Sequence, residues 1–278
     1  MDDRKGRTFL ITGANTGIGL ATATALAAAG GQIYLACRSA DKGERAVYEV
    51  RNRTGNEDVF FLRLDLADLA QVRECADAFL ARDEPLHVLI NNAGVAGQRG
   101  VTTDGFELAF GVNHMGHFAL TTALLGRLAD SGPARVVTVS SEAHHQARGI
   151  DYASVRQRTR SMTGMSEYAV SKLANVAFTA ELAGRLAGTP VTTYSLHPGV
   201  VASDIWRRVP WPIRPLMTAR MLTTEAGART SLYCATSPEV AHASGRFYVD
   251  CAERDPSPVA TAELAAELWR RSEEWVAQ

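Results

Sequence analysis

The strongest constraint on the fold is a regular alternation of short β-rich runs and longer helical patterns along the 278-residue chain. Most of the short runs are continuously apolar, which is typical of strands buried on both faces of a parallel sheet. The alternation predicts an α/β fold with one doubly wound parallel sheet of about seven strands and helices on both faces. The predicted strands are Thr8–Ile11, Ile33–Ala36, Val59–Leu64, Val88–Ile90, Arg135–Val139, Val191–Leu196 and Phe247–Val249.

The helical patterns fill the intervals between these strands. They cover Ile18–Ala29, Lys42–Arg53, Leu69–Ala81, Phe106–Leu128, Tyr168–Leu186, Thr224–Thr236 and about Ala260–Val276. No shift in composition and no internal repeat divides the chain, so we predict a single domain over residues 1–278.

Two irregular segments interrupt the rhythm, at residues 142–166 and 203–222. The second contains Trp206, Trp211, three prolines and four arginines. Irregular segments of this length in a compact domain are usually functional. We therefore predict a substrate flap at about 203–222, with an apolar wall for a sizeable substrate. A weak membrane-surface patch is the alternative interpretation of its arginines.

Composition excludes several classes of function. The net charge of −1 and the pI near 6.7 give no basic footprint, so nucleic acid is not an expected partner. The four cysteines form no CxxC pair and the histidines form no HExxH motif, which indicates reduced thiols and no metal site. No apolar run reaches the roughly 18 residues of a membrane span, and about six polar residues before the first strand leave no room for a signal peptide. A cytoplasmic location without integral membrane association is expected.

A glycine-rich segment, TGANTGIG at residues 12–19, follows the first predicted strand and opens the first helix. In that context Gly13 permits a tight turn, Gly17 lets the backbone approach a pyrophosphate, and Gly19 lets helix and strand pack closely. The helix N-terminus then offers free N–H groups to the phosphates. An ordinary glycine-rich turn is the alternative. The predicted cofactor contacts in this segment are Gly13, Asn15, Thr16, Gly17, Ile18 and Gly19.

The end of the second strand predicts which dinucleotide is bound. An acidic residue about 20 residues beyond the glycine motif would bind a ribose 2′-hydroxyl, but Arg38 stands there instead. A guanidinium can pair with a 2′-phosphate, and a charge-assisted hydrogen bond is worth roughly 1.5–3 kcal/mol, or about tenfold to hundredfold in affinity. We therefore predict NADP(H), with a solvated surface arginine as the alternative.

The ends of the third and fourth strands complete the predicted cofactor site. Asp65 either accepts from an adenine amino group or caps the following helix. Asn91 or Asn92 either approaches the cofactor or ties neighbouring strands together. The predicted contacts from these two strand ends are Asp65, Leu66, Asn92, Ala93 and Gly94.

The motif with the most chemistry is Tyr-Ala-Val-Ser-Lys at residues 168–172. Tyr168 and Lys172 are four residues apart, so on a helix they lie on one face. A neighbouring ammonium favours the phenolate and lowers a pKa that starts near 10. The pair thus predicts a general acid–base that works near neutral pH, and an accidental pair on an exposed helix face is the alternative.

Taken in order, these motifs resemble the short-chain dehydrogenase/reductase family, whose fold is a Rossmann-type sheet. Within it the chain looks most like the retinol dehydrogenase-type branch. The segments that carry the resemblance are residues 12–19, 34–38, 91–94, 113–118, 140–144, 168–175 and 197–199.

The resemblance implies a catalytic tetrad of Asn113, Ser141, Tyr168 and Lys172. Tyr168 would be the acid–base, and Lys172 would lower its pKa and bind the nicotinamide ribose. Ser141 would hold the substrate oxygen, with Ser140 facing the other way, and Asn113 would anchor a water in a proton relay. Two further cofactor contacts near the nicotinamide carboxamide are implied, Pro198 and Gly199.

One departure from most of the family is the gap of 27 residues between Ser141 and Tyr168, although a longer gap suits the retinol dehydrogenase-like branch. The extra residues must loop out, or the serine would be misplaced. His144 and His145 lie in this excursion near the predicted site, where a structural or substrate-gating role is favoured over proton transfer.

These features predict an NADPH-dependent reductase of a bulky, apolar ketone or aldehyde. One alternative is an NADP-linked, retinol-like alcohol dehydrogenase that works in the oxidative direction. Another is a non-catalytic NADP(H)-sensing protein. The expected partner is a small hydrophobic carbonyl or alcohol substrate. The family commonly pairs through two long helices, but both monomer and homodimer remain open for this chain.

Overall fold

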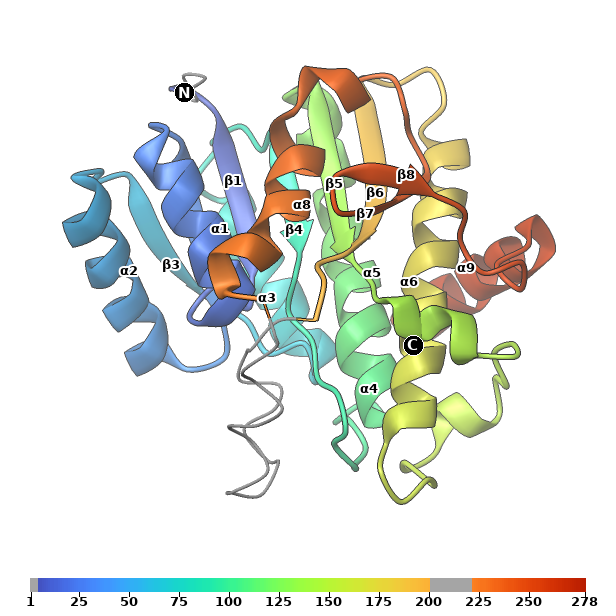
Figure 1. The fold of residues 1–278 in the computed structure, drawn as a ribbon. Helices are drawn as coiled ribbons and strands as arrows, with labels where there is room; N and C mark the ends of the chain where they lie inside the picture. The colour runs from blue at the N-terminus through green and yellow to red at the C-terminus, as the bar shows by residue number, and fades with distance from the viewer. Residues whose placement is uncertain (1–4, 201–221) are drawn as a thin grey trace.

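A computed structural model describes residues 5–200 and 222–278, so the predicted flap, apart from Leu222, lies outside the described residues. The described strands form one eight-stranded sheet in the order β3-β2-β1-β4-β5-β6-β7-β8 (Figure 1). Their bounds are β1 Thr8–Thr12, β2 Gln32–Cys37, β3 Val59–Arg63, β4 Val88–Asn91, β5 Ala134–Val139, β6 Val191–His197, β7 Arg246–Val249 and β8 Ala252–Arg254.

The first seven strands are those predicted from the sequence, and all pair in parallel. In the middle of the sheet Leu10 of β1 lies between Tyr34 of β2 and Leu89 of β4. The eighth strand was not predicted: β8 pairs antiparallel with β7 after a two-residue connection. Both connecting residues, Asp250 and Cys251, have positive φ, as in a type I′ hairpin turn.

Helices cover both faces of the sheet (Figure 1). On one face lie α1, α2 and α8, and on the other lie α3, α5, α6 and α9. No helix among the described residues is long and apolar enough to cross a bilayer. The helix bounds are α1 Gly17–Ala28, α2 Ala40–Thr54, α3 Leu69–Leu80, α4 Leu108–Phe110, α5 Gly116–Asp130, α6 Met165–Arg185, α8 Thr224–Thr236 and α9 Ala262–Val276.

Local sequence explains where most of these helices begin. Four side chains accept hydrogen bonds from the first turns of α2, α3, α8 and α9, which satisfies backbone donors that have no partner within the helix. These caps are Ser39, Asp68, Thr223 and Thr261. Helix α1 begins differently, because Thr16 makes no side-chain capping hydrogen bond there.

The long helix predicted over Phe106–Leu128 is interrupted. The short helix α4 passes into a π-helical turn at Gly111–Met115 before α5 begins. The hydrophobic pattern does not change at this point, so periodicity alone could not reveal the interruption. Asn113 lies in the π-helical turn, and such turns are frequent at functional sites.

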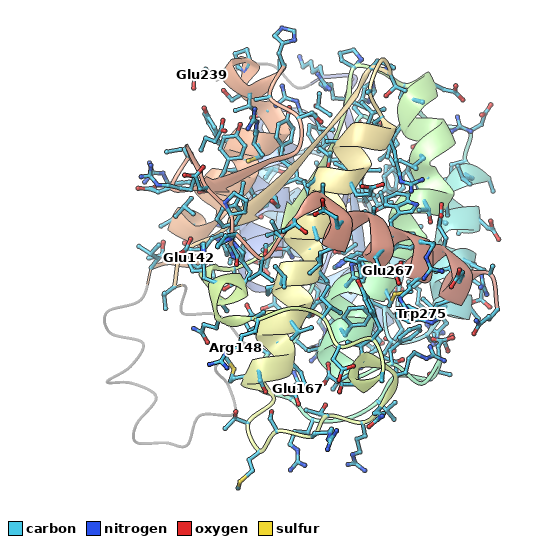
Figure 2. All side chains as sticks on the ribbon, turned by 90° about the vertical axis from the view of Figure 1, so that its right-hand side faces the viewer. Glu142, Arg148, Glu167, Glu239, Glu267 and Trp275 are labelled. Atoms are coloured by element: carbon cyan, nitrogen blue, oxygen red, sulfur yellow. The ribbon has the colours of Figure 1, made fainter. Side chains whose placement is uncertain are left out.

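The C-terminal helix α9 crosses α6 on the outer side of the helical layer (Figure 2). Trp269 is buried, with its ring stacked on Phe178 and edge-on to Phe118 of α5. Trp275 packs against Phe106 and Phe110. Both tryptophans therefore pack this helix onto α4, α5 and α6.

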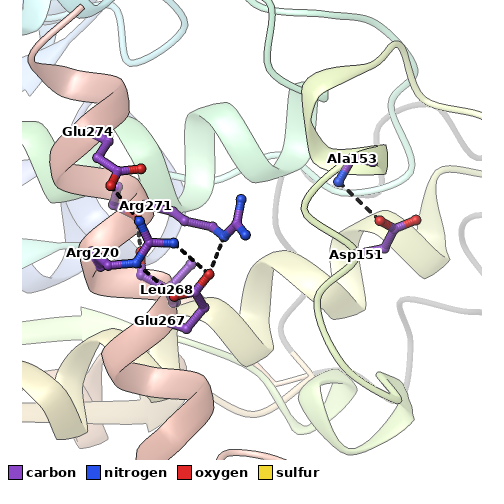
Figure 3. A network of polar contacts seen from close by, with 8 residues as sticks. Asp151, Ala153, Glu267, Leu268, Arg270, Arg271 and Glu274 are labelled. Carbon is purple, nitrogen blue, oxygen red and sulfur yellow. Dashed lines mark hydrogen bonds and ion pairs between the residues drawn. The ribbon is translucent and has the colours of Figure 1, made fainter.

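A network of ion pairs lies on the exposed side of α9 (Figure 3). Glu267 accepts hydrogen bonds from Arg270 and Arg271, and Arg270 also pairs with Glu274. The guanidinium of Arg271 lies 4.5 Å from the ring centroid of Tyr152 in the irregular 142–166 segment. Helix α9 thus contacts the same segment that connects the two predicted catalytic motifs.

Candidate active site

The candidate site lies at the carboxyl ends of the parallel strands. The sheet order places β1 next to both β2 and β4. Strands β2 and β3 are added on one side of β1, and the strands from β4 onwards are added on the other side. In open α/β sheets ligands bind at such a switch point. The glycine segment after β1 and the Asn-Asn-Ala-Gly segment after β4 meet there.

The glycine turn is packed too tightly for other residues. A Cβ on Gly13 would lie 2.9 Å from the Cα of Ala93, and a Cβ on Gly19 would lie 2.6 Å from the carbonyl oxygen of Gly13. Gly13 and Gly17 also have positive φ, at 65° and 58°. The glycines leave the backbone without side chains where α1 begins. A dinucleotide pyrophosphate needs this close approach to the backbone.

Three other predicted contacts lie in this turn. Asn15 and Thr16 connect β1 to α1, and Ile18 is in the first turn of the helix. Asn15 and Ile18 are partly buried, whereas Thr16 is exposed. All three are therefore beside the start of α1, where an anion would be bound.

Asn92 ties β4 to β1, which was one of the two interpretations left open by the sequence. Its Nδ2 donates to the carbonyl of Thr12 at 2.7 Å, and its backbone N–H donates to the hydroxyl of Thr12 at 2.9 Å. The backbone N–H of Ala93 donates to the same hydroxyl. Asn91 is also committed to the fold, since its Nδ2 donates to Thr121 of α5.

Arg38 and Asp65 lie at the ends of β2 and β3. The Arg38 side chain is 76% exposed, and its Nε lies 3.9 Å from Oδ2 of Asp65. Asp65 accepts from the N–H of Ala67, but Asp68 is the residue that caps α3, so the capping interpretation of Asp65 is wrong. The Leu66 side chain is buried in the core, which leaves its backbone as the group available to a cofactor.

The predicted catalytic residues Ser141 and Tyr168 meet beyond the end of β5. The side chain of Ser141 lies close enough to the Tyr168 phenol to lower its pKa. Ser140 faces away, as predicted: it is buried, and its hydroxyl donates to the backbone carbonyl of Lys172 at 2.7 Å. The 27-residue excursion therefore loops out and leaves the serine within reach of the tyrosine.

Lys172 lies one helical turn from Tyr168, buried beneath the site. Its Nζ is 5.6 Å from the centroid of the Tyr168 ring and donates to the carbonyl of Val139 at 2.8 Å. That carbonyl also accepts from Nδ2 of Asn175. A Cβ on Gly94 would lie 3.7 Å from the ammonium, so the turn after β4 passes directly over Lys172.

The charge states differ from the sequence-based expectation. Burial raises the pKa of the Tyr168 phenol, and the side chain of Ser141, not the charge of Lys172, is what opposes that rise. Burial also lowers the pKa of Lys172 to about 7. The charge of Lys172 is not among the causes that set the Tyr168 pKa in the ligand-free protein, where the ammonium itself is desolvated, and its role in lowering that pKa stays a prediction.

The side chain of Asn113 is fully committed to the protein. Its Oδ1 accepts from the N–H of Val95, and its Nδ2 donates to the carbonyl of Val95 and to the hydroxyl of Ser171. Its backbone carbonyl accepts from Nδ1 of His117 at 2.9 Å. A relay water would therefore have to bind that carbonyl rather than the side chain, and the relay role stays a prediction.

The last two predicted contacts, Pro198 and Gly199, follow β6. Gly199 has a φ of 85°, and a Cβ there would lie 2.5 Å from Cδ1 of Leu222. The two ends of the segment that contains the predicted flap are thus packed together beside this turn.

Comparison with known proteins agrees with this geometry. The short chain dehydrogenase family matches residues 7–211. The chain belongs to the short-chain dehydrogenase family.

Its relatives in the family place it among the retinol dehydrogenase-like members. It is 47% identical over 274 residues to retinol dehydrogenase 12 from Homo sapiens, covering 96% of this chain and 85% of that protein. A crystal structure from Mycobacterium paratuberculosis is 36% identical with a TM-score of 0.80, covering 100% of this chain and 96% of the other. A structure described as an NAD(P)-dependent gluconate 5-dehydrogenase from Beutenbergia cavernae, with bound NADP, is 25% identical with a TM-score of 0.72, covering 89% and 96%.

This short-chain dehydrogenase is therefore an oxidoreductase of retinol dehydrogenase-like type. Its site contains supporting residues that were not among the predicted contacts, namely Thr12, His117 and Ser171. Each hydrogen-bonds a predicted site residue from a different element. All three stand inside the quoted motifs, but only the packed fold shows which groups they contact.

A cavity of about 190 Å³ beside the start of α6 does not belong to this site. Glu107, Phe110, Asp151, Val155 and Val170 are among its lining residues, and none of the predicted tetrad lines it. We therefore do not assign the substrate to it. Among the described residues no cluster of His, Cys, Asp or Glu is placed to bind a metal ion.

Proposed function

We propose that this short-chain dehydrogenase is an NADPH-dependent reductase of a bulky, apolar ketone or aldehyde. The observation that carries the proposal is that Ser141, Tyr168 and Lys172 meet at the carboxyl end of β5, with the Ser141 side chain close enough to the Tyr168 phenol to lower its pKa and Nζ of Lys172 5.6 Å from the centroid of its ring. Both hydroxyls lie beside Lys172 and the Gly94 turn, at the edge of the sheet where the glycine segment would hold a dinucleotide. The names of the relatives, retinol dehydrogenases among them, support an apolar alcohol or carbonyl substrate.

The proposed reaction uses the paired hydroxyls as donors. When bound, the reduced nicotinamide supplies a hydride to the carbonyl carbon. Ser141 and Tyr168 donate hydrogen bonds to the carbonyl oxygen, so the charge that develops there meets preplaced dipoles. Tyr168 then gives its proton to that oxygen as the general acid.

Lys172 tunes the acid in this scheme. Its pKa of about 7 leaves a substantial fraction of the side chain protonated at neutral pH. An ammonium 5.6 Å from the Tyr168 ring favours the phenolate that remains after proton transfer. The burial that raises the Tyr168 pKa makes the phenol a weaker acid, and the charged Lys172 offsets this.

The preference for NADP(H) is proposed from Arg38. Its exposed guanidinium lies at the end of β2, where the ribose of a dinucleotide bound at the switch point would lie, and the contact with Asp65 at 3.9 Å leaves it solvated. The NADP-bound relative from Beutenbergia cavernae supports a fold that accepts this cofactor. Reduction as the working direction follows only from the usual reduced state of the NADP pool.

Two further expectations remain proposals. Helix α9 packs on α6 and contacts α5, the kind of long helices through which the family commonly pairs, which supports a monomer. A cytoplasmic location is proposed from the sequence. The alternatives of an oxidative alcohol dehydrogenase and a non-catalytic sensor are separated from the reductase by turnover.

The test is a screen of apolar aldehydes and ketones with NADPH and with NADH, following the absorbance of the reduced nicotinamide. We expect turnover with NADPH, and a preference over NADH that falls by about tenfold to hundredfold in Arg38→Asp. A wild type that prefers NADH contradicts the role of Arg38. Turnover only of alcohols with NADP⁺ supports the oxidative alternative, and binding without turnover in either direction supports the sensor.

A further inference from the structure

His144 is completely buried directly behind the catalytic serine. It belongs to the short 3-10 helix Glu142–Gln146 that follows Ser141, and its ring lies edge-on to Phe247 of β7 with centroids 4.8 Å apart. Its Nδ1 lies 2.6 Å from the carbonyl oxygen of Ser141. Its Nε2 accepts from the backbone N–H of Ser257 at 2.9 Å.

The two partners determine where the imidazole proton lies. A backbone N–H can only donate, so Nε2 must be the bare, accepting nitrogen. The carbonyl of Ser141 can only accept, so Nδ1 must carry the proton. His144 is thus a neutral imidazole in the Nδ1–H tautomer, with both nitrogens committed to the backbone.

The same contacts fix the position of Ser141. Its carbonyl accepts from both the backbone N–H and Nδ1 of His144, and its hydroxyl accepts from the N–H of Ala143 at 3.2 Å. The side chain held in this way lies close enough to the Tyr168 phenol to lower its pKa.

We propose that His144 is a positioning residue that fixes Ser141 at Tyr168 and couples it to the C-terminal segment at Ser257. The inference rests on the proposed function, in which Ser141 is a donor to the substrate oxygen. It also explains how a serine followed by the long excursion to Tyr168 stays in place: the histidine attaches the first turn of that excursion to Ser257, a buried residue between exposed neighbours near the other end of the chain.

Protonation would break this arrangement. An imidazolium carries a proton on Nε2, which would then face the N–H of Ser257. Burial lowers the pKa of His144 first, with smaller downward effects from His145 and His197, while the Ser141 carbonyl and Glu142 oppose this. The protonation of His144 is therefore set by its burial, by neighbouring groups from the 3-10 helix and β6, and by the apolar ring of Phe247 from β7.

The decisive variants are His144→Phe, which keeps the ring but loses both hydrogen bonds, and His144→Asn, which restores a donor where Nδ1 stood. The matched control is His145→Phe, since that neighbouring side chain is 40% exposed. We expect kcat to fall roughly tenfold in His144→Phe, the equivalent of one hydrogen bond, and to recover in part in His144→Asn. KM for the carbonyl, NADPH affinity measured by fluorescence and the kcat of His145→Phe should change less than about twofold.

A double-mutant cycle separates positioning from general stability. In a Ser141→Ala background, His144→Phe should have no further effect on kcat, because the group it positions is gone. We expect the wild-type kcat to fall at acidic pH as His144 is protonated, and we expect this fall to be absent from His144→Asn. Equal effects of His144→Phe in both backgrounds, or a loss in His145→Phe as large as in His144→Phe, overturn the proposal.

A measurement on the unliganded wild type needs neither turnover nor a folded variant. The ¹⁵N shifts of the His144 ring should show a protonated Nδ1 and a bare Nε2, and the Nε2–H tautomer overturns the proposal. If no carbonyl or alcohol is turned over, the proposed function fails, while the ring shifts still decide whether His144 holds Ser141.

Discussion

Ser141 lies close enough to the Tyr168 phenol to lower its pKa, although the two residues are 27 positions apart in the chain. The intervening residues leave β5, form two 3-10 turns and return to the start of α6. Glu142 and Glu167 mark the two ends of this path (Figure 2). The proximity of the two side chains is thus a property of the folded excursion rather than of local spacing.

Replacing Ser141 by alanine should lower kcat by about 10²–10³-fold, because one of two donors to the developing oxyanion is lost. The matched control is Ser140→Ala, whose hydroxyl donates to the Lys172 carbonyl instead. That change should lower the free energy of unfolding by about 1 kcal/mol and leave kcat within a few-fold of the wild-type value. Steady-state kinetics and thermal unfolding of both variants provide the comparison. A larger loss of kcat in Ser140→Ala would show that the donor was assigned to the wrong serine.

Lys172→Met should raise the Tm of the cofactor-free protein at pH 6 while abolishing most activity. The folded-state pKa of about 7 lies below the unfolded value near 10.4, so the unfolded chain binds more protons between these pH values. Wild-type stability therefore rises with pH across that window, and the full cost of the buried ammonium is present below it.

In calorimetry the variant should exceed the wild type by at least about 2 °C at pH 6, with a difference that shrinks by pH 9. A Tm difference that does not vary with pH would mean that Lys172 is not buried as a destabilising charge.

Gly19→Ala should weaken NADPH binding by at least about tenfold. The new methyl group would lie 2.6 Å from the carbonyl oxygen of Gly13, so the backbone of the turn must shift. The matched control is Gly126→Ala in α5, where a Cβ meets nothing within 4 Å. That helix substitution should stabilise the protein by about 0.5–1 kcal/mol without changing NADPH affinity. Fluorescence titration measures the NADPH affinity of both variants. Equal affinities in the two variants would exclude the glycine turn as the phosphate site.

The sequence predicts the parallel sheet well because most of its strands are short, continuous apolar runs that alternate with longer helical patterns. It missed β8, since the hairpin turn at Asp250 and Cys251 contains neither glycine nor asparagine, the residues that most often indicate a positive φ. It also missed the π-helical turn around Asn113, because nearly every residue there is buried and no one-sided apolar stripe exists whose period could change.

The sequence identified the candidate site residues more securely than their physical state. Motif spacing brought Ser141, Tyr168 and Lys172 together, but spacing does not measure burial. The desolvation that raises the Tyr168 pKa and lowers that of Lys172 arises from tertiary packing. The contact of His144 with Ser257 joins residues 113 positions apart, which no local pattern can reveal.

The central claim is that the Tyr168 phenol is the proton donor of a reductase, and Tyr168→Phe tests it most directly. The variant keeps the ring and loses only the hydroxyl. With a carbonyl substrate found in the NADPH screen, kcat should fall by about 10²–10⁴-fold while NADPH affinity stays within a few-fold of the wild type. An unchanged kcat in Tyr168→Phe would contradict the account.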